Sequence, residues 1–332
     1  MMVATERLPA DPIQRHAALR NYFCDKDASA VRTPEGWALA LSWPGDPDRH
    51  VDPGLDAGLR WWGDVRREDM ATARRRTSRL LRTLYDSWTL ASWSEWLARR
   101  PDRTAGLVTI LHVDDHRDLG SPRLGGKGTP WLDLISERTC DLHEPSSVAA
   151  AIESGAIGMG SFMTPFLLDV PQAEVRHLCQ PPKGKRTEDY LFRPTDVPDT
   201  LLAPGTLRPG IELVPAEPGT GPGRWRTTPS VDDWLADIDG GPILLHVDMD
   251  YFCNRYDGDS DWGDRELRLD PPPEMIDHKI DEVVGALDAK GLAGRIEDVV
   301  IAFSPGFFPA EHWGRADERL TQGLGLDAER RG

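Results

Sequence analysis

Leu107-Val108-Thr109-Ile110-Leu111-His112-Val113-Asp114-Asp115-His116-Arg117-Asp118 is an apolar, β-branched run that stops abruptly at clustered carboxylates. A second run has the same design: Pro242-Ile243-Leu244-Leu245-His246-Val247-Asp248-Met249-Asp250. Apolar runs of this length are typical of buried strands in a parallel sheet. In open α/β sheets, ligands bind just beyond the carboxyl ends of the strands. We therefore expect Asp-x-His-x-Asp and Asp-x-Asp to face one crevice.

Other segments extend this pattern of strands and helices. The sequence predicts helices at 146–154 and 274–289 and a last buried strand at 298–303. Strands that alternate with helices indicate an α/β fold, and we expect a three-layer α/β/α domain with a mainly parallel sheet. Residues 64–100 have a helical pattern, with a basic face formed by five arginines, and 156–162 resembles a strand that enters a loop. The five arginines are Arg74, Arg75, Arg76, Arg79 and Arg82.

The positions of proline- and glycine-rich stretches suggest how the chain is divided into regions. Residues 1–60 form an irregular N-terminal extension, with a short strand candidate at 37–43. Residues 61–332 form the main α/β domain. Within it, 181–229 holds ten prolines, and we interpret this part as an excursion from the sheet, with a β-hairpin and long loops as one form it could take.

Composition excludes several classes of function. The 332 residues carry a formal net charge of -16, which argues against nucleic acid as a partner, because phosphate binding needs a basic face. No run approaches the ~18 apolar residues of a membrane span. The N-terminal residues lack the apolar core of a signal peptide. The four cysteines are scattered without a CxxC pair, which favours reduced thiols and a cytoplasmic protein.

The carboxylates at the two strand ends predict a metal site. Clustered carboxylates and an imidazole repel one another or desolvate at a cost unless a cation lies between them. Hard carboxylates with one imidazole suit Mn²⁺, Fe²⁺ or Zn²⁺. The candidate ligands are Asp114, His116, Asp118, Asp248 and Asp250. A plainer interpretation is that these aspartates cap turns, but two separate strand ends with five potential ligands favour the metal.

This pairing of motifs resembles the arginase (ureohydrolase) and deacetylase superfamily. Within it, the form His112-Val-Asp-Asp-His-Arg-Asp-Leu119, with Asp248-Met-Asp-Tyr-Phe252 and Ser304-Pro-Gly-Phe307, is closest to a poorly characterised family that includes peptide arginases of ribosomal-peptide (RiPP) biosynthesis. The resemblance implies an arginase–deacetylase-like fold. It also implies a metal-dependent hydrolase that converts arginine in a precursor peptide to ornithine and urea.

The resemblance also implies residue roles. Asp114 and Asp248 bridge two ions, Mn²⁺ by preference, while Asp118 completes one ion's shell and His116 and Asp250 complete the other's. A metal-bound hydroxide, oriented by Asp118, attacks the guanidinium carbon. The leaving amine needs a proton, for which His143 and His246 are candidates by residue type. Glu311 is a candidate for binding the guanidinium through paired hydrogen bonds.

One position departs from the family pattern. The family has another metal-binding histidine upstream of the first site strand, and Trp88 stands where we expect it. Either Asp86 or His112 substitutes for it, or one ion is weakened or lost. A single ion, Zn²⁺ or Fe²⁺ among the options, would favour a deacetylase or amidohydrolase. A non-catalytic binding protein with a decayed site is the remaining alternative.

Overall fold

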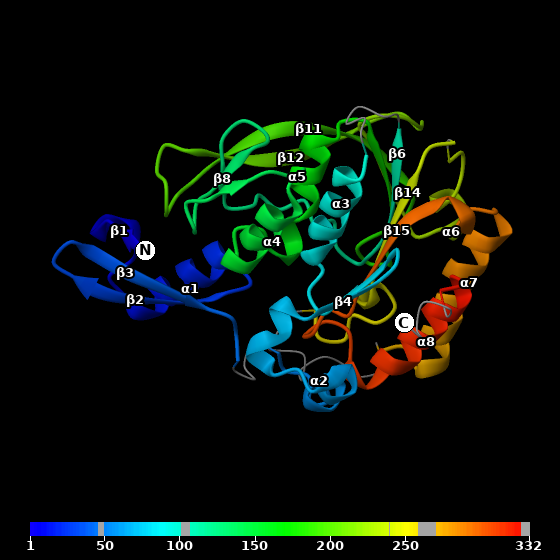
Figure 1. Cartoon of the computed structure of the whole chain (residues 1–332), viewed down its shortest axis with the longest axis horizontal. Helices are drawn as coiled ribbons and strands as arrows, with labels where there is room; N and C mark the ends of the chain where they lie inside the picture. The colour runs from blue at the N-terminus through cyan, green and yellow to red at the C-terminus, as the bar shows by residue number, and fades with distance from the viewer. Residues whose placement is uncertain (46–49, 101–106, 239, 258–269, 327–332) are drawn as a thin grey trace.

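The computed structural model describes residues 1–45, 50–100, 107–238, 240–257 and 270–326. Within these residues, nine strands form one large sheet (Figure 1). In sheet order the strands are β12 (Leu207–Pro215), β11 (Glu188–Pro198), β13 (Arg224–Thr228), β10 (Ala173–Leu178), β6 (Val108–Val113), β14 (Ile243–Asp248), β15 (Ile296–Ala302), β5 (Leu80–Thr83) and β4 (Arg74–Thr77).

The centre of this sheet is parallel, and antiparallel hairpins form its two edges. The strands from β13 across to β5 run parallel, while β11–β12 and β4–β5 pair antiparallel. β6 and β14 are neighbours in register, with His246 opposite His112. Every residue of both strands is buried. Both predicted site strands are confirmed, as is the last buried strand, so their carboxyl ends meet at one edge.

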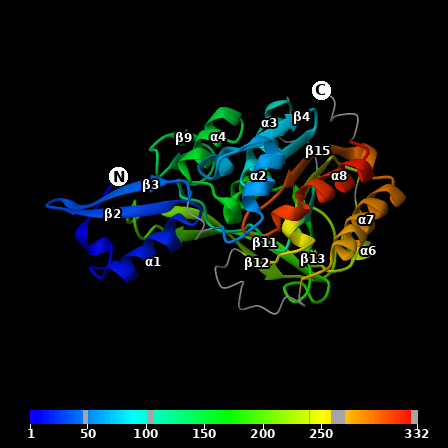
Figure 2. The same cartoon turned by 90° about the horizontal axis from the view of Figure 1, so that it is seen from below.

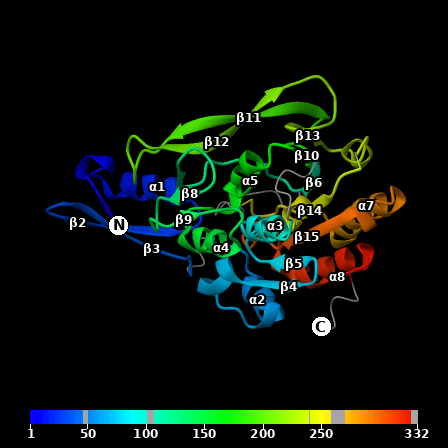
Figure 3. The ribbon, with the colours of Figure 1, turned by 45° about the horizontal axis from the view of Figure 1, so that its top comes forward.

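Helices cover both faces of the sheet. Figures 1 and 3 show α3, α4 and α5 on one side of the central strands and α6, α7 and α8 on the other. Their bounds are α3 (Trp88–Ala98), α4 (Pro145–Ser154), α5 (Met163–Asp169), α6 (Val231–Trp234), α7 (Pro273–Ala289) and α8 (Trp313–Gly323). The predicted helices at 146–154 and 274–289 are confirmed. The chain is thus α/β with a mostly parallel sheet, an arrangement compatible with three layers.

The N-terminal region is ordered, so the predicted irregular extension was wrong. It contains β1 (Met2–Val3), α1 (Pro12–Phe23), β2 (Asp27–Thr33), β3 (Gly36–Ser42) and α2 (Leu55–Gly63). The three strands form a small separate sheet, which projects from the main body (Figure 2). Asp11 caps α1 by accepting a hydrogen bond from the backbone of Gln14, and Pro12 starts the helix. The strand predicted at 37–43 is confirmed as β3.

The helical prediction for 64–100 was wrong in its first half. Residues 74–83 form the β4–β5 hairpin, and only α3 is an α-helix. Ser78 has a positive φ of 51° in the connecting turn, a conformation that no helix interior contains. The strand predicted at 156–162 was also wrong, since a short 3-10 helix at Met159–Ser161 interrupts it.

The proline-rich part at 181–229 is built into the main sheet and is not an excursion from it. β11 and β12 form the expected hairpin, but β13 then pairs in parallel with β10. A second small sheet contains β7 (Leu124–Gly125), β8 (Trp131–Asp133) and β9 (Thr139–Cys140). The other short 3-10 helices span Thr5–Arg7, Arg67–Thr72, Met249–Tyr251, Ala293–Arg295 and Ala310–His312. Among the described residues, no helix combines the length and apolar character that crossing a membrane requires.

Candidate metal centre

Three strands of the main sheet deliver carboxylates to the same edge. Asp114 follows β6, Asp248 ends β14, and Asp86 follows β5. Several sets of side chains here offer ligand atoms within 4.8 Å of one another, and two of them contain the carboxylates of these strand ends with at most one imidazole. The first set is Asp114, His116 and Asp250, and the second is Asp86, Asp114 and Asp248. Because Asp114 belongs to both sets, its carboxylate is common to two groups of potential metal ligands.

The first set is held by short local hydrogen bonds. The backbone N–H of His116 donates to Asp114 Oδ1 at 2.6 Å, so the loop folds back over the strand end. The Nδ1 atom of His116 lies 2.9 Å from Asp250 Oδ2 and 3.6 Å from Asp114 Oδ1. An ion bound between these oxygens would therefore meet Nδ1 of the imidazole.

The second set depends on Asp248 and on Asp86. Asp248 Oδ1 accepts the backbone N–H of Asp250 at 3.0 Å, and Oδ2 accepts the hydroxyl of Ser304 at 2.5 Å. Both bonds fix the carboxylate plane. Ser304 has a positive φ of 43° after the end of β15, which turns its side chain back toward β14. The serine of the Ser-Pro-Gly-Phe motif thus supports a candidate ligand.

Asp86, which the sequence suggested only as one option, lies in the site where a histidine was expected. Its side chain is buried, and its Oδ1 atom has no hydrogen-bond partner among the described residues. Trp88 instead lies in the core, where its Nε1–H donates to the carbonyl of Ala71 and Arg74 stacks on its ring. Asp86, and not Trp88, therefore contributes a side chain to the carboxylate cluster.

Mutual proximity and burial strongly perturb these carboxyl groups. Burial, then the charges of Asp248 and Asp114, raises the pKa of Asp86 well above its usual value. Burial and the neighbouring carboxylates raise the pKa values of Asp118 and Asp248 in the same way. The pKa of Asp250 rises to about 6, chiefly through burial and Asp114. Without a cation, these four carboxyl groups therefore favour retained protons, whereas nearby His112 and His116 outweigh burial and lower the pKa of Asp114.

The residues fit a divalent cation. Asp86 Oδ1, Asp114 Oδ2 and Asp118 Oδ2 are buried oxygens without a donor among the described residues, and all belong to this cluster. Buried acceptors without donors are costly unless a cation or another donor satisfies them. Carboxylate oxygens with one imidazole suit the first-row divalent metals. The buried groups can hold a metal ion, and they do not determine which metal it is.

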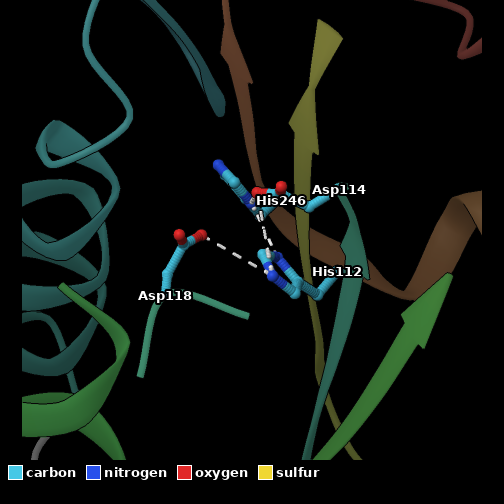
Figure 4. A group of neighbouring side chains, drawn as sticks. All are labelled: His112, Asp114, Asp118 and His246. Carbon is cyan, nitrogen blue, oxygen red and sulfur yellow. Dashed lines mark hydrogen bonds and ion pairs between the residues drawn. The ribbon is translucent and has the colours of Figure 1, made fainter. Parts of the chain in front are cut away.

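The side chains of His112 and His246 point toward those of Asp114 and Asp118 (Figure 4). Together with Asp114 and Asp118 they form another set of potential ligands. However, His112 Nε2 lies 3.1 Å from the carbonyl of His116, which can only accept, so Nε2 carries the hydrogen. His112 Nδ1 then accepts from His246 Nδ1–H at 2.9 Å. Both ring nitrogens of His112 and Nδ1 of His246 are thus used in hydrogen bonds, and we assign these residues to the hydrogen-bonded core.

A third histidine continues this row into β10. His177 lies opposite His112 in the sheet, and its Nε2–H donates to the backbone carbonyl of Asp114 at 3.0 Å. Its Nδ1 lies 3.3 Å from the hydroxyl of Thr227, which accepts the Nε1–H of Trp225 at 2.9 Å. Burial lowers the pKa of each of the three imidazoles, that of His246 to about 3. They are neutral supports of the strand end that carries Asp114.

A cavity of about 410 Å³ opens onto the carboxylates. Its wall contains the candidate ligands Asp86, His116, Asp118, Asp248 and Asp250, together with Arg117, Leu119, Gly120, Met159, Gly160, Ser304 and Phe307. Asp118 has a positive φ of 52°, which turns its carboxylate back into the cluster, 3.7 Å from His112 Nε2. The structure therefore brings all five predicted ligands together and adds Asp86.

Three other predicted site residues lie outside this cavity wall. His143 pairs with Asp169 at 3.2 Å, at the end of α5. Glu311 accepts a hydrogen bond from Arg255 at 2.7 Å and lines a different cavity. His246 is fully buried beneath the ligands. His143 and His246 were selected by residue type and Glu311 by its position after a late strand, and partners distant in sequence hold each of them outside the cavity wall.

Comparison with known proteins adds no assignment to this geometry. The chain matches no described protein family, and no curated protein is significantly similar to it. The roles of the residues therefore rest on the arrangement of the side chains themselves.

Proposed function

We propose that this protein is a metal-dependent hydrolase of carbon–nitrogen bonds other than peptide bonds, with an arginase-like fold. In its most concrete form it is a peptide arginase that converts arginine in a precursor peptide to ornithine and urea. One observation carries the proposal: the buried carboxylate of Asp114 is shared between two sets of potential ligand atoms at the carboxyl edge of a parallel sheet. Two-ion hydrolytic sites use such a shared carboxylate.

The residues in the cavity have complementary tasks. Asp114, His116 and Asp250 would hold one ion, and Asp86, Asp114 and Asp248 the other, with Mn²⁺ favoured. Bound ions supply Lewis acidity and lower the pKa of water. Asp118 faces the cavity and can accept a hydrogen bond from the attacking water. The acidic wall attracts a cationic guanidinium, and Phe307 supplies an apolar surface for the rest of that side chain.

Metal content per chain tests this proposal. After growth with Mn²⁺, we expect about two ions per chain in the wild type and loss of the ion held by Asp86, Asp114 and Asp248 in Asp248→Ala. Urea release from arginine-containing peptides should follow the metal. Glu311→Gln is the matched control, because this carboxylate lies outside the cavity, and it should retain both properties. Two ions without urea release from any arginine peptide would contradict the arginase form of the proposal.

One observation favours a second candidate function, a single-metal deacetylase or amidohydrolase. The set of Asp86, Asp114 and Asp248 contains carboxylates alone, whereas the other set includes an imidazole. Imidazole strengthens binding of the later first-row metals, so the all-carboxylate position is the weaker one. About one tightly bound ion, with activity on acyl-amines, would support this alternative. If neither the wild type nor Asp248→Ala contained metal, both enzyme proposals would fail, and a non-catalytic binding protein would be the remaining alternative.

A further inference from the structure

A polar network contacts the candidate ligands His116 and Asp250. It consists of Asp115, Lys183, Asn254 and Asp257, which line a second cavity of about 260 Å³. Asp257 Oδ1 accepts from Lys183 Nζ at 3.0 Å and from Asn254 Nδ2 at 2.9 Å. The same oxygen lies 3.3 Å from His116 Nε2. The proposed reaction leaves this network without a role.

The two nitrogens of His116 face different surroundings. Nδ1 faces the carboxylates of the metal centre, and Nε2 faces Asp257 and Lys183. If Nδ1 binds an ion, the neutral ring must carry its hydrogen on Nε2. That N–H needs an acceptor. An ammonium group cannot accept a hydrogen bond, whereas the Asp257 carboxylate can.

Lys183 keeps Asp257 in this position. Its ammonium lies 2.9 Å from Asp115 Oδ2 and 3.0 Å from Asp257 Oδ1, so it bridges the two carboxylates and offsets their repulsion. Lys183 Nζ also lies 2.9 Å from His116 Nε2. Once Nε2 carries a hydrogen, the ammonium must direct its own hydrogens to the carboxylates. This requirement strengthens the pairing between Lys183 and Asp257.

The network also reaches the second ligand. Asn254 Nδ2 donates to Asp115 Oδ2 at 2.8 Å, and the backbone N–H of Asp115 donates to Asp250 Oδ1 at 3.2 Å. His116 and Asp250 are therefore both held from behind by one connected set of side chains. None of these contacts involves the second ion position, which Asp86 and Asp248 form.

We propose that Asp257, held by Lys183 and Asn254, is the positioning residue that directs Nδ1 of His116 toward the ion. The inference rests on the metal site of the proposed function and does not depend on which reaction that site performs. Partners that orient metal-bound histidines typically contribute about 10–100-fold to metal affinity. The expected effect is confined to the position that contains His116.

Titration of the metal-free protein with Mn²⁺, followed by calorimetry, tests this assignment. We expect Asp257→Ala to weaken one class of site by about 10–100-fold and to leave the other unchanged. Asp257→Asn retains an acceptor oxygen, so its affinity should lie between those of Asp257→Ala and the wild type. Lys183→Met should weaken the same class of site by a smaller factor. Glu212→Gln, an exposed carboxylate on β12, is the control and should match the wild type.

The outcomes separate this inference from the proposed function. Tight Mn²⁺ binding by the wild type, with unchanged affinity in both Asp257→Ala and Lys183→Met, would overturn the positioning role while the hydrolase proposal stood. A uniform loss at both classes of site would also overturn it. If the wild type itself binds no Mn²⁺, both proposals fail. Mn²⁺ affinity that falls from the wild type to Asp257→Asn and again to Asp257→Ala supports the positioning role. If Asp257 were purely structural, its variants would lower the unfolding temperature without producing this order of affinities.

Discussion

Asp86 and Trp88 are two positions apart, yet one faces the metal centre and the other the core. We predict that Asp86→Ala weakens the site shared with Asp114 and Asp248 by at least about tenfold, whereas Asp86→His retains Mn²⁺ binding there. Trp88→His should gain no ion and should lower stability by about 3 kcal/mol, because it empties a fully buried position. Mn²⁺ titration and thermal unfolding of the three variants check both effects. A gain of metal affinity in Trp88→His would contradict the placement.

The contrast between Asp86 and the other ligands shows what the sequence could reveal. Asp114 and Asp248 follow long apolar runs, so their positions at strand ends could be predicted. Asp86 follows β5, which is only four residues long and contains Arg82. That arginine is buried because its Nε donates to Asp317 at 2.6 Å, from α8 near the other end of the chain. The sequence near β5 does not show that Arg82 is buried, because its partner Asp317 lies more than 200 residues away. The alternating or continuous apolar pattern that would identify a strand is therefore broken at Arg82.

At the level of elements, the β4–β5 hairpin explains why a basic segment belongs to the core. Arg76 of β4 pairs at 2.8 Å with Asp298 of β15, which also accepts from Ser92 of α3 at 2.5 Å. Asp298 is fully buried, whereas the Arg76 side chain is about a quarter exposed (25%). Through these two contacts, Asp298 joins β4 and β15 to α3. The expectation that these arginines form the basic face of a helix was therefore wrong for Arg76 and for the buried Arg82.

We predict that Arg76→Met destabilises the protein by about 3 kcal/mol, the lower end of the range for leaving a buried charge unpaired, because the guanidinium is partly solvated. Arg75→Met, on the same strand but exposed, should cost less than about 1 kcal/mol. Urea-induced unfolding of both variants measures the difference. Equal effects would show that Asp298 does not depend on its arginine partner.

For the whole molecule, the carboxylate cluster predicts an unusual dependence of stability on pH. The pKa of Asp250 is about 6 in the folded chain and about 4 when unfolded. The folded state thus binds more protons, so its stability falls as pH rises from about 4 to about 6. Asp86, Asp118 and Asp248, whose pKa values are raised further, extend this loss to higher pH. We expect metal-free protein to unfold at a lower temperature at pH 8 than at pH 5.

Bound metal should reverse this trend, since ions bind deprotonated ligands and their stabilising effect grows with pH. Thermal unfolding with EDTA and with Mn²⁺, across pH 5 to 8, makes the comparison. Asp250→Asn should flatten the part of the metal-free profile below about pH 6. Equal stability of the metal-free protein at pH 5 and pH 8 would contradict the raised pKa values of these carboxyl groups.

The overall class of the fold was accessible from the sequence, but the N-terminal unit was not. Two apolar runs that end in carboxylates predict a parallel sheet because burial on both faces leaves a continuous local pattern. The N-terminal unit has a separate small core, which includes Leu19, Phe23 and Trp37 and is completed by Leu201. A core that needs a residue more than 150 positions away leaves only a weak pattern in residues 1–45.

That N-terminal unit touches the wall of the metal cavity through the loop that follows α1. Asp25 Oδ2 accepts the backbone N–H of Met159 at 2.8 Å, and Lys26 Nζ donates to the carbonyl of Glu153 at 2.7 Å. Met159 itself lines the cavity. Substitutions in the first 45 residues can therefore shift the cavity wall while every candidate ligand stays in place. This separation gives evolution a way to change which molecules enter the cavity without altering the residues that surround the ions.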